Sequence, residues 1–203
     1  MTMGALVVFE GIDGCGKSTQ LRLLEAALQA TGMEVYCTRQ PTSLYRDDPK
    51  VRAYLDRGHA RISMHELCLL AAKDRHRHLE EVVLPNLTRG CWVLCDRYTY
   101  SSYAYFRARG VELSFVRQAN EGVRRPDVTV FLDISPEDAR RRVLGREGTI
   151  TKFEEKSLQF MSVVRDTFLE CRDESFDVMD ARQPPEMLHA AIVSSIERRL
   201  GVG

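Results

Sequence analysis

The chain has 203 residues, of which 44% are apolar and 29% charged, a balance that is ordinary for a globular protein and too apolar for a disordered one. Lysine and arginine together number 29, as do aspartate and glutamate. The formal net charge is therefore zero, so we expect no broad nucleic-acid or membrane surface, although a local basic pocket remains allowed. At about 150 residues per domain, this length predicts a single domain over 1–203.

Short apolar runs alternate along the chain with longer amphipathic stretches. In chain order they predict a strand over 5–9, a helix over 17–30, a strand over 34–38, a long helix with a potential interruption over 64–87, a strand over 92–95, a strand over 128–134, a helix over 136–146, a strand over 176–179 and a helix over 185–200. The first strand is continuous in apolar residues, which is typical of burial on both faces. Strands that alternate with helices indicate a parallel sheet, whose binding sites lie at the carboxyl ends of the strands.

The cysteines and histidines show no metal-binding arrangement. The 6 cysteines match no zinc pattern, and a chain of this length needs no disulfides. We expect the histidines, including His65, His76 and His78, to lie at the surface. No apolar run approaches the ~18 residues of a membrane-spanning helix, and no basic region precedes the first short apolar run. We therefore expect a reduced, cytoplasmic protein.

A phosphate-binding motif directly follows the first predicted strand. Residues 11–18 read GIDGCGKS, which matches G-x-x-x-x-G-K-[ST] without deviation. Glycines let successive backbone N–H groups converge on an anion, and the positive end of the following helix points to the same place. Lys17 is placed to reach the β- and γ-phosphates, and Ser18 to hold Mg²⁺. The residues predicted to bind ATP are Gly11, Gly14, Cys15, Gly16, Lys17, Ser18 and Thr19.

This P-loop indicates a nucleoside triphosphate but not a reaction, because GTPases, motor ATPases and small kinases share it. The sequence has no Asn/Thr-Lys-x-Asp motif that would read guanine, and it is too short for a large ATPase module. Further motifs follow in order: FEGIDG (9–14), TRQP (38–41), DR (74–75), EEVVLP (80–85), DRY-x-x-SS (96–102), PD (126–127) and FE (153–154).

Together these motifs resemble the thymidylate kinases, P-loop enzymes that transfer the γ-phosphoryl group of ATP to dTMP. The resemblance covers nearly the whole chain, and the DRY-x-x-SS run is much more specific than the P-loop. It implies an α/β fold of three layers, the P-loop NTPase fold, with five parallel strands in the order 2-3-1-4-5. It also implies a mobile lid at about 140–152, Mg²⁺, ATP and dTMP as substrates, and a homodimer.

The expected site brings two polyanions together, so cations have to offset their repulsion. Arg39 follows the second predicted strand and, by resemblance, binds the acceptor phosphate; an exposed arginine at a strand end is the alternative. Arg97 follows the third strand and is expected at the same phosphate or at the transferring one, where a planar guanidinium suits bidentate binding. Asp96 is either a ligand of a Mg²⁺-bound water or the partner of an arginine.

Five further residues belong to the acceptor site by resemblance. Asp13 is expected near the sugar 3′-hydroxyl and the metal shell, or alternatively in a local Asx turn. Arg75 is expected to hydrogen-bond the pyrimidine base, or alternatively to lie on a solvated helix face. Tyr105 is expected under the sugar, where it would crowd a 2′-hydroxyl, or alternatively in the core. Ser101 and Ser102 complete this set.

The lid segment carries a cluster of arginines after the fourth predicted strand. Position 15 of the P-loop is cysteine, and relatives without an arginine in this loop supply one from the lid. Arg142 and Arg146 fit the family positions best, whereas Arg140 and Arg141 are expected on a solvated helix. Cys15 is expected to be a small loop residue and not a nucleophile. The predicted catalytic residues are Lys17, Arg97, Arg142 and Arg146.

The sequence departs from the family pattern around the acceptor pocket and the lid. Ala71 stands where relatives place an aromatic ring that stacks on thymine, and such stacking contributes roughly 1–3 kcal/mol per base. Phe106 stands where many relatives have glutamine and offers a substitute surface. Gln40 replaces an acidic residue, and Lys152 replaces an arginine. None of these changes touches the expected phosphoryl-transfer core.

Three hypotheses follow from these observations. The first is a dTMP kinase that uses MgATP. The second is a kinase of the same family with a different or modified nucleoside monophosphate as acceptor, motivated by Ala71 and Phe106. The third is a nucleotide-binding regulator without catalysis. Against the third stand four residues that a pure sensor would not need: Lys17, Ser18, Asp96 and Arg97.

Overall fold

A computed structural model describes residues 4–57, 61–149 and 157–201. Five parallel strands form its central sheet, in the spatial order β2-β3-β1-β4-β5. They are β1 (Leu6–Glu10), β2 (Val35–Arg39), β3 (Trp92–Asp96), β4 (Val128–Asp133) and β5 (Phe176–Asp180). The predicted parallel sheet and its strand order are confirmed.

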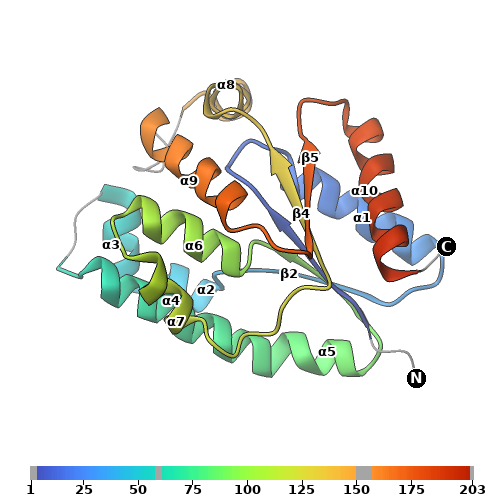
Figure 1. Ribbon diagram of the computed structural model, residues 1–203, viewed down its shortest axis with the longest axis horizontal. Helices are drawn as coiled ribbons and strands as arrows, with labels where there is room; N and C mark the ends of the chain where they lie inside the picture. The colour runs from blue at the N-terminus through green and yellow to red at the C-terminus, as the bar shows by residue number, and fades with distance from the viewer. Residues whose placement is uncertain (1–3, 58–60, 150–156, 202–203) are drawn as a thin grey trace.

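Helices cover both faces of the sheet and complete a three-layer fold (Figure 1). One face carries α1 (Lys17–Ala30) and α10 (Pro185–Leu200); the other carries α4 (Met64–His78), α5 (Leu84–Thr88), α6 (Thr99–Ala108) and α9 (Leu158–Glu170). The short helices α2 (Ser43–Arg46), α3 (Pro49–Arg57) and α7 (Leu113–Ala119) lie around α4 and α6, and α8 (Pro136–Glu147) packs against α9. Among the described residues, no helix is both long and apolar enough to cross a membrane.

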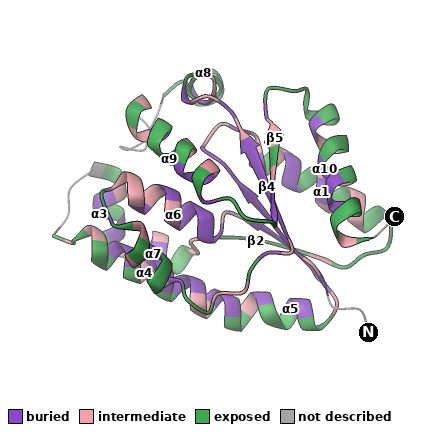
Figure 2. Ribbon diagram, viewed as in Figure 1, coloured by how far each residue is buried: buried purple, intermediate pink, exposed green. Residues whose placement is uncertain are grey.

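The central strands are buried because helices cover the sheet on both faces. Every residue of β1 has an exposed fraction of 0%, and β4 is buried along five of its six positions. Figure 2 shows this burial in the strands and on the inward sides of the helices, whereas α8 is largely exposed. The strands therefore form a rigid platform for the loops at their carboxyl ends.

The parallel register places several charged residues at one edge of the sheet. Asp96 pairs with Phe9 of β1 on one side and with Arg39 of β2 on the other. Glu10 ends β1 immediately before the P-loop. The carboxyl ends of β1, β2 and β3 thus bring Glu10, Arg39 and Asp96 together, as expected for parallel strands.

The predicted long helix over 64–87 is present, and its predicted interruption is a change of helix type and not a break in the helix. α4 continues without a break into η1 (Leu79–Val83), a π-helical segment, and then into α5. π-Segments inside α-helices are rare and often lie near functional sites. Here the segment begins one residue after His78, whose ring lies within hydrogen-bond distance of Thr38 and Gln40 at the end of β2.

Five helices were not predicted from the sequence: α2, α3, α6, α7 and α9. α9 carried a readable signal, because Met161, Val164 and Phe168 recur at helical spacing and are all buried. α6 carried none, because six of its ten residues are buried and its sequence TYSSYAYFRA shows no apolar stripe. Sequence periodicity therefore does not reveal α6, although this helix carries the predicted site residues Ser101, Ser102 and Tyr105.

Candidate active site

The P-loop forms the turn between β1 and α1, as predicted. Gly16 precedes α1 with φ of 105° and Gly14 has φ of 90°, backbone conformations that glycine adopts without strain. Lys17 lies folded over the loop, and its Nζ donates to the carbonyl oxygens of Gly11 at 3.0 Å and Ile12 at 3.2 Å. The chain thus supplies an anion-binding turn with a lysine at its mouth.

Helix α8, which carries part of the predicted lid, packs directly on the P-loop. A Cβ added to Gly14 would lie 2.5 Å from the carbonyl oxygen of Ala139 and 3.0 Å from Cγ2 of Val143, so only glycine permits this approach. Cys15 is buried with an exposed fraction of 1%, and its sulfur lies on the inner side of the loop beside Gly11. Cys15 is therefore a small residue that packs inside the loop.

Arg97 is the centre of the site. It follows β3 with φ of 69°, a left-handed conformation that costs a non-glycine residue of order 1–3 kcal/mol and that occurs at functional sites. Its guanidinium forms an ion pair and hydrogen bond with Asp13, donates to Ser101 Oγ at 3.2 Å and to the Tyr105 hydroxyl at 3.3 Å, and lies 5.1 Å from the Tyr105 ring centroid. Four of the predicted acceptor residues therefore meet here.

Glu10 anchors the start of α6 beneath Arg97, a role that the sequence analysis missed. Its carboxylate accepts from the backbone N–H groups of Tyr98 at 2.8 Å and Ser101 at 3.0 Å, and from Ser101 Oγ at 2.5 Å. Burial raises the pKa of Glu10, against the hydrogen bonds and the charge of Arg97 that lower it. A charged residue at the end of an otherwise apolar strand is the signal that could have found it.

Three arginines gather near the end of β2. Arg39 is exposed and its guanidinium lies 3.7 Å from Oδ2 of Asp96. Arg46, at the end of α2, lines the same cavity as Arg97, and its Nε donates to the Pro41 carbonyl at 2.7 Å. Burial, followed by the charges of Arg39 and Arg97, lowers the pKa of Arg46, which shows that positive charge is concentrated here. Sequence reasoning did not single out Arg46.

Asp96 has one carboxylate oxygen that is buried without a partner. Oδ1 makes no hydrogen bond within the described part of the chain, while Oδ2 faces Arg39. Because a buried carboxylate oxygen requires a cation or a donor, this atom fits a water of a Mg²⁺ shell. Ser18 lies at the N-terminal end of α1, where its exposed hydroxyl is available to the same ion.

A cavity lies beyond Arg97, between α2, α3, α4 and α6, and is the candidate acceptor pocket. Its lining residues are Pro41, Tyr45, Arg46, Leu55, Ala71, Arg75, Arg97, Tyr98, Ser101, Ser102, Tyr105, Phe106 and Arg109. Arg46 and Arg97 lie at its P-loop end, and the far end combines apolar and aromatic side chains with Arg75 and Arg109. This polarity suits a nucleotide with its phosphate toward the P-loop and its base toward α4.

Arg75 is buried at the base end of this cavity, so the alternative of a solvated helix face is wrong. Its exposed fraction is 2%. Nε donates to Asn120 Oδ1 at 2.8 Å, and the two terminal nitrogens donate to Gln40 Oε1 and to Ser102 Oγ. Burial lowers the pKa of this arginine, since desolvation penalises its charge. A buried cation held only by neutral acceptors is poised for a ligand oxygen.

Ala71 and Phe106 face the same cavity from neighbouring helices. Both are buried, with exposed fractions of 3%, and both belong to one apolar cluster. The guanidinium of Arg109 lies 4.8 Å from the Phe106 ring centroid and 5.5 Å from that of Tyr54. A ring on α6 and a guanidinium above it thus flank the space beside Ala71.

The two predicted lid arginines make contacts outside the P-loop. Arg142 donates to the carbonyl oxygen of Ala181 at 2.8 Å, and Arg146 pairs with Glu147 at 2.6 Å. Arg140 lines a small cavity together with Asp13, so it lies nearer the site than expected. The predicted lid extends to Lys152, whose position, like that of the FE motif at 153–154, falls outside the described residues.

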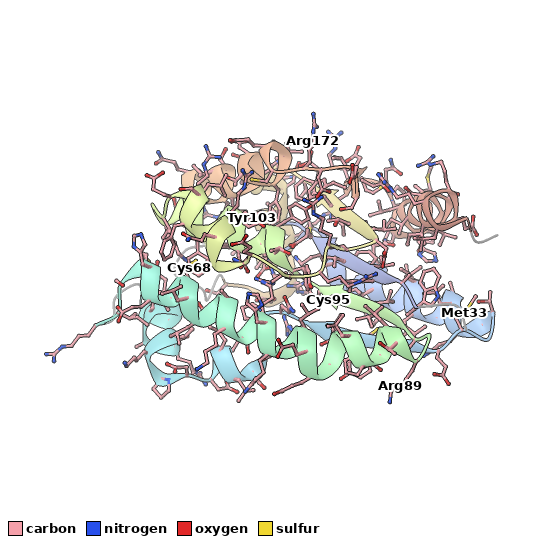
Figure 3. All side chains as sticks on the ribbon, turned by 60° about the horizontal axis from the view of Figure 1, so that its bottom comes forward. Met33, Cys68, Arg89, Cys95, Tyr103 and Arg172 are labelled. Atoms are coloured by element: carbon pink, nitrogen blue, oxygen red, sulfur yellow. The ribbon has the colours of Figure 1, made fainter. Side chains whose placement is uncertain are left out.

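The expectation that the histidines lie at the surface is wrong for His78. Its exposed fraction is 6%, because α4 packs this part of its length under β2 and the loop that follows. The 6 cysteines are free thiols, as expected, and Figure 3 shows Cys68 in α4 well apart from Cys95 in the sheet. No group of three or more His, Cys, Asp or Glu side chains in the described residues is arranged to hold a metal by itself.

Comparison with known proteins identifies the family of this chain. A family model described as thymidylate kinase matches residues 9–192. The chain belongs to the thymidylate kinase family. It is 35% identical over 202 residues to a probable thymidylate kinase of Pyrococcus horikoshii, covering 97% of this chain and 98% of the relative. It is 36% identical to a thymidylate kinase of Magnetococcus marinus, with 98% of each chain covered, and 39% identical to one of Trichlorobacter lovleyi, with 97% and 98% covered.

Membership of the thymidylate kinase family confirms the resemblance drawn from the motifs. The P-loop, the DRY-x-x-SS run and Arg75 all lie within the matched region. In the structure these segments converge on one cleft, with the phosphate-binding turn on one side and the cavity on the other.

Proposed function

We propose that this protein is a dTMP kinase, which transfers the γ-phosphoryl group of ATP to dTMP and releases dTDP and ADP. The observation that carries the proposal is the ion pair between Asp13 and Arg97. It joins the P-loop to the acceptor cavity, so that the two nucleotides would meet at a single point. Family membership and the names of the relatives point to the same reaction.

The chain's own residues perform this reaction by positioning and by charge. The P-loop amides and Lys17 would hold the β- and γ-phosphates, while Arg97 and Arg46 would hold the acceptor phosphate in line. Arg39 would join them as a third, more exposed cation. Since phosphoryl transfer needs little covalent help, offsetting the repulsion of the two phosphates is the main task. A lid arginine, Arg142 or Arg146, would complete the charge stabilisation.

Mg²⁺ fits the residues present at this site. Ser18 and the unpartnered Oδ1 of Asp96 would hold the ion or its waters. Mg²⁺ is generally bound by one or two protein oxygens together with substrate phosphates, which agrees with the absence of a larger ligand cluster among the described residues. When bound, the ion would supply a Lewis acid to the phosphate oxygens.

The base and the sugar would occupy the far end of the cavity. Arg75 would donate to a carbonyl oxygen of the base, and Tyr105 would pack against the sugar. Phe106 and Arg109 would flank the base in place of a ring at position 71. From its family membership we also propose that this protein acts in the cytoplasm and assembles as a homodimer.

An acceptor screen tests this function. ADP release would be measured with MgATP and dTMP, dUMP, dCMP or dAMP at equal concentration. We expect dTMP to give the highest kcat/KM. Arg75 offers N–H donors to a carbonyl oxygen of the base, and apolar side chains of the cavity wall would pack against its methyl group. Equal rates on all four acceptors would reject dTMP as the substrate, and no turnover on any would favour a non-catalytic nucleotide-binding protein.

A further inference from the structure

A chain of hydrogen bonds runs from β2 through α4 to the acceptor cavity. His78 Nε2 lies 2.8 Å from Thr38 Oγ1, and His78 Nδ1 lies 2.9 Å from Gln40 Nε2. Gln40 Oε1 in turn accepts from Arg75. Gln40 and Arg75 have exposed fractions of 1% and 2%. Water therefore cannot replace a broken link without a rearrangement.

Arg75, at the end of this series of hydrogen bonds, determines which atom donates in each of them. An arginine side chain can only donate, so the atom of Gln40 that faces Arg75 must be the amide oxygen. The amide nitrogen of Gln40 then donates to His78 Nδ1, which must be unprotonated. A neutral imidazole with a bare Nδ1 carries its proton on Nε2, and this N–H donates to Thr38 Oγ1.

Electrostatics agrees with a neutral imidazole at this place. Burial lowers the pKa of His78, and the charges of Arg75 and Arg77 lower it further, against the opposite influence of Asp74 and Glu81. Asp74 directs its carboxylate to the backbone N–H of Thr42 at 2.7 Å. The network around Arg75 is therefore built from neutral acceptors.

The same network fixes the guanidinium plane of Arg75. Asn120, Gln40 and Ser102 each take one of its N–H groups, one on each nitrogen. A guanidinium has five N–H groups, so one remains on each terminal nitrogen, and Arg75 lines the cavity. A rotation of the Gln40 amide would place its NH₂ group against the guanidinium, donor against donor, and would displace it.

We propose that Gln40 and His78 are positioning residues for acceptor binding: His78, as the Nε2–H tautomer, holds the Gln40 amide in the single orientation that aims Arg75 at the acceptor base. This inference rests on the proposed function, because it presumes a base in this cavity. Neither side chain touches the reacting phosphates, so both act on the binding of the acceptor and not on the transfer step.

The tautomer is tested on the whole protein by NMR of ¹⁵N-labelled histidine at pH 7.5. The His78 resonances would be assigned from their loss in His78→Asn. We expect a protonated Nε2 and a bare Nδ1. A protonated Nδ1, or an average of the two tautomers, would overturn the proposal whatever the enzyme's substrate is.

Steady-state kinetics with dTMP and ATP test the positioning role. His78→Leu removes the acceptor for Gln40, and we expect the KM for dTMP to rise about tenfold or more with kcat and the KM for ATP nearly unchanged. His78→Asn keeps an oxygen acceptor bonded to Cγ, as Nδ1 is, and should stay within about threefold of wild type. His65→Leu, at an exposed histidine of the same helix α4, is the control for loss of an imidazole.

The outcomes separate the two proposals. An equal rise in KM for His78→Leu and His78→Asn, or no rise in either, would overturn the positioning role while dTMP turnover stood. A fall in kcat without a change in KM would also overturn it, because the transfer step would then depend on this network. If dTMP is not turned over at all, the proposed function fails, and the NMR result still decides the hydrogen-bond network.

Discussion

At the scale of single residues, the site depends on cations placed in unusual surroundings. Arg75 is desolvated, Arg97 adopts a left-handed backbone conformation, and Lys17 folds back on loop carbonyls. The left-handed backbone of Arg97 and the desolvation of Arg75 cost free energy in the folded chain, and a bound carbonyl oxygen would offset the desolvation of Arg75. We propose that phosphoryl transfer between two nucleotides uses all three.

Lys17→Ala tests the division of labour between the P-loop and the acceptor pocket. We expect kcat to fall by about 10²–10³-fold or more, because a preorganised cation at the transferring phosphate is lost. The affinity for dTMP, measured by calorimetry, should stay close to wild type, since the acceptor is bound by arginines from other strand ends. Loss of dTMP binding in parallel with turnover would contradict this division.

At the scale of elements, α6 and not α4 contributes the large side chain of the pair Phe106 and Ala71, which share one apolar cluster and line one cavity. Ala71 on α4 is small, and Phe106 on α6 fills the cluster that both share. The family pattern has a ring on α4 and commonly glutamine on α6. Packing of two neighbouring helices constrains their summed volume, so we propose that an exchange of side-chain size between the two helices accounts for both departures.

Ala71→Phe and Phe106→Gln test this exchange by a double-mutant cycle. Ala71→Phe alone should lower the free energy of unfolding by about 1–3 kcal/mol through overpacking. Phe106→Gln alone should lower it as well, because it leaves a cavity and a buried amide. The double variant should be more stable than the sum predicts by about 1 kcal/mol, as measured by urea unfolding. Strict additivity would show that the two side chains do not share space.

α8 is the element that would carry the catalytic arginine. We expect the double variant of Arg142→Ala and Arg146→Ala to lower kcat by about 10³-fold or more, the magnitude typical of an arginine that stabilises a transferring phosphoryl group. Arg141→Ala is the matched control, because this exposed arginine pairs only with Asp138 among the described residues. A near-normal kcat for the double variant would show that the cation comes from elsewhere.

At the scale of the whole molecule, the candidate site lies at the carboxyl ends of the strands, and α10 covers one face of the sheet at β4 and β5. Asp177 of β5 accepts from Arg199 Nε at 2.6 Å and also from Ser195, which ties the last helix to the last strand. Burial would raise the pKa of Asp177, but the hydrogen bonds from Arg199 and Ser195 outweigh burial and lower it. The ionised carboxylate therefore stabilises the folded chain.

Asp177→Asn should lower the free energy of unfolding by about 1 kcal/mol at pH 7. Since the folded-state pKa lies below the ordinary value of 3.8, this contribution is complete above about pH 4 and is lost as the pH falls through the folded-state pKa. Urea unfolding at several pH values measures the difference from wild type, with Glu121→Gln as a control for the loss of one charge. A difference that did not shrink as the pH fell below 3.8 would contradict an electrostatic origin.

The sequence by itself determined the P-loop, the parallel sheet and the family, because these depend on local glycine spacing, on continuous apolar runs and on the order of short motifs. It also named Arg39, Arg75 and Arg97, since residues just after strands or within specific motifs are marked by their neighbours in the chain. The tertiary structure alone decided the rest. Gln40 and His78 are separated by 38 positions, and Glu10 and Ser101 by 91. No pattern in the sequence predicts such pairs, because these hydrogen bonds join distant segments and form only when the sheet brings the carboxyl ends of its strands together.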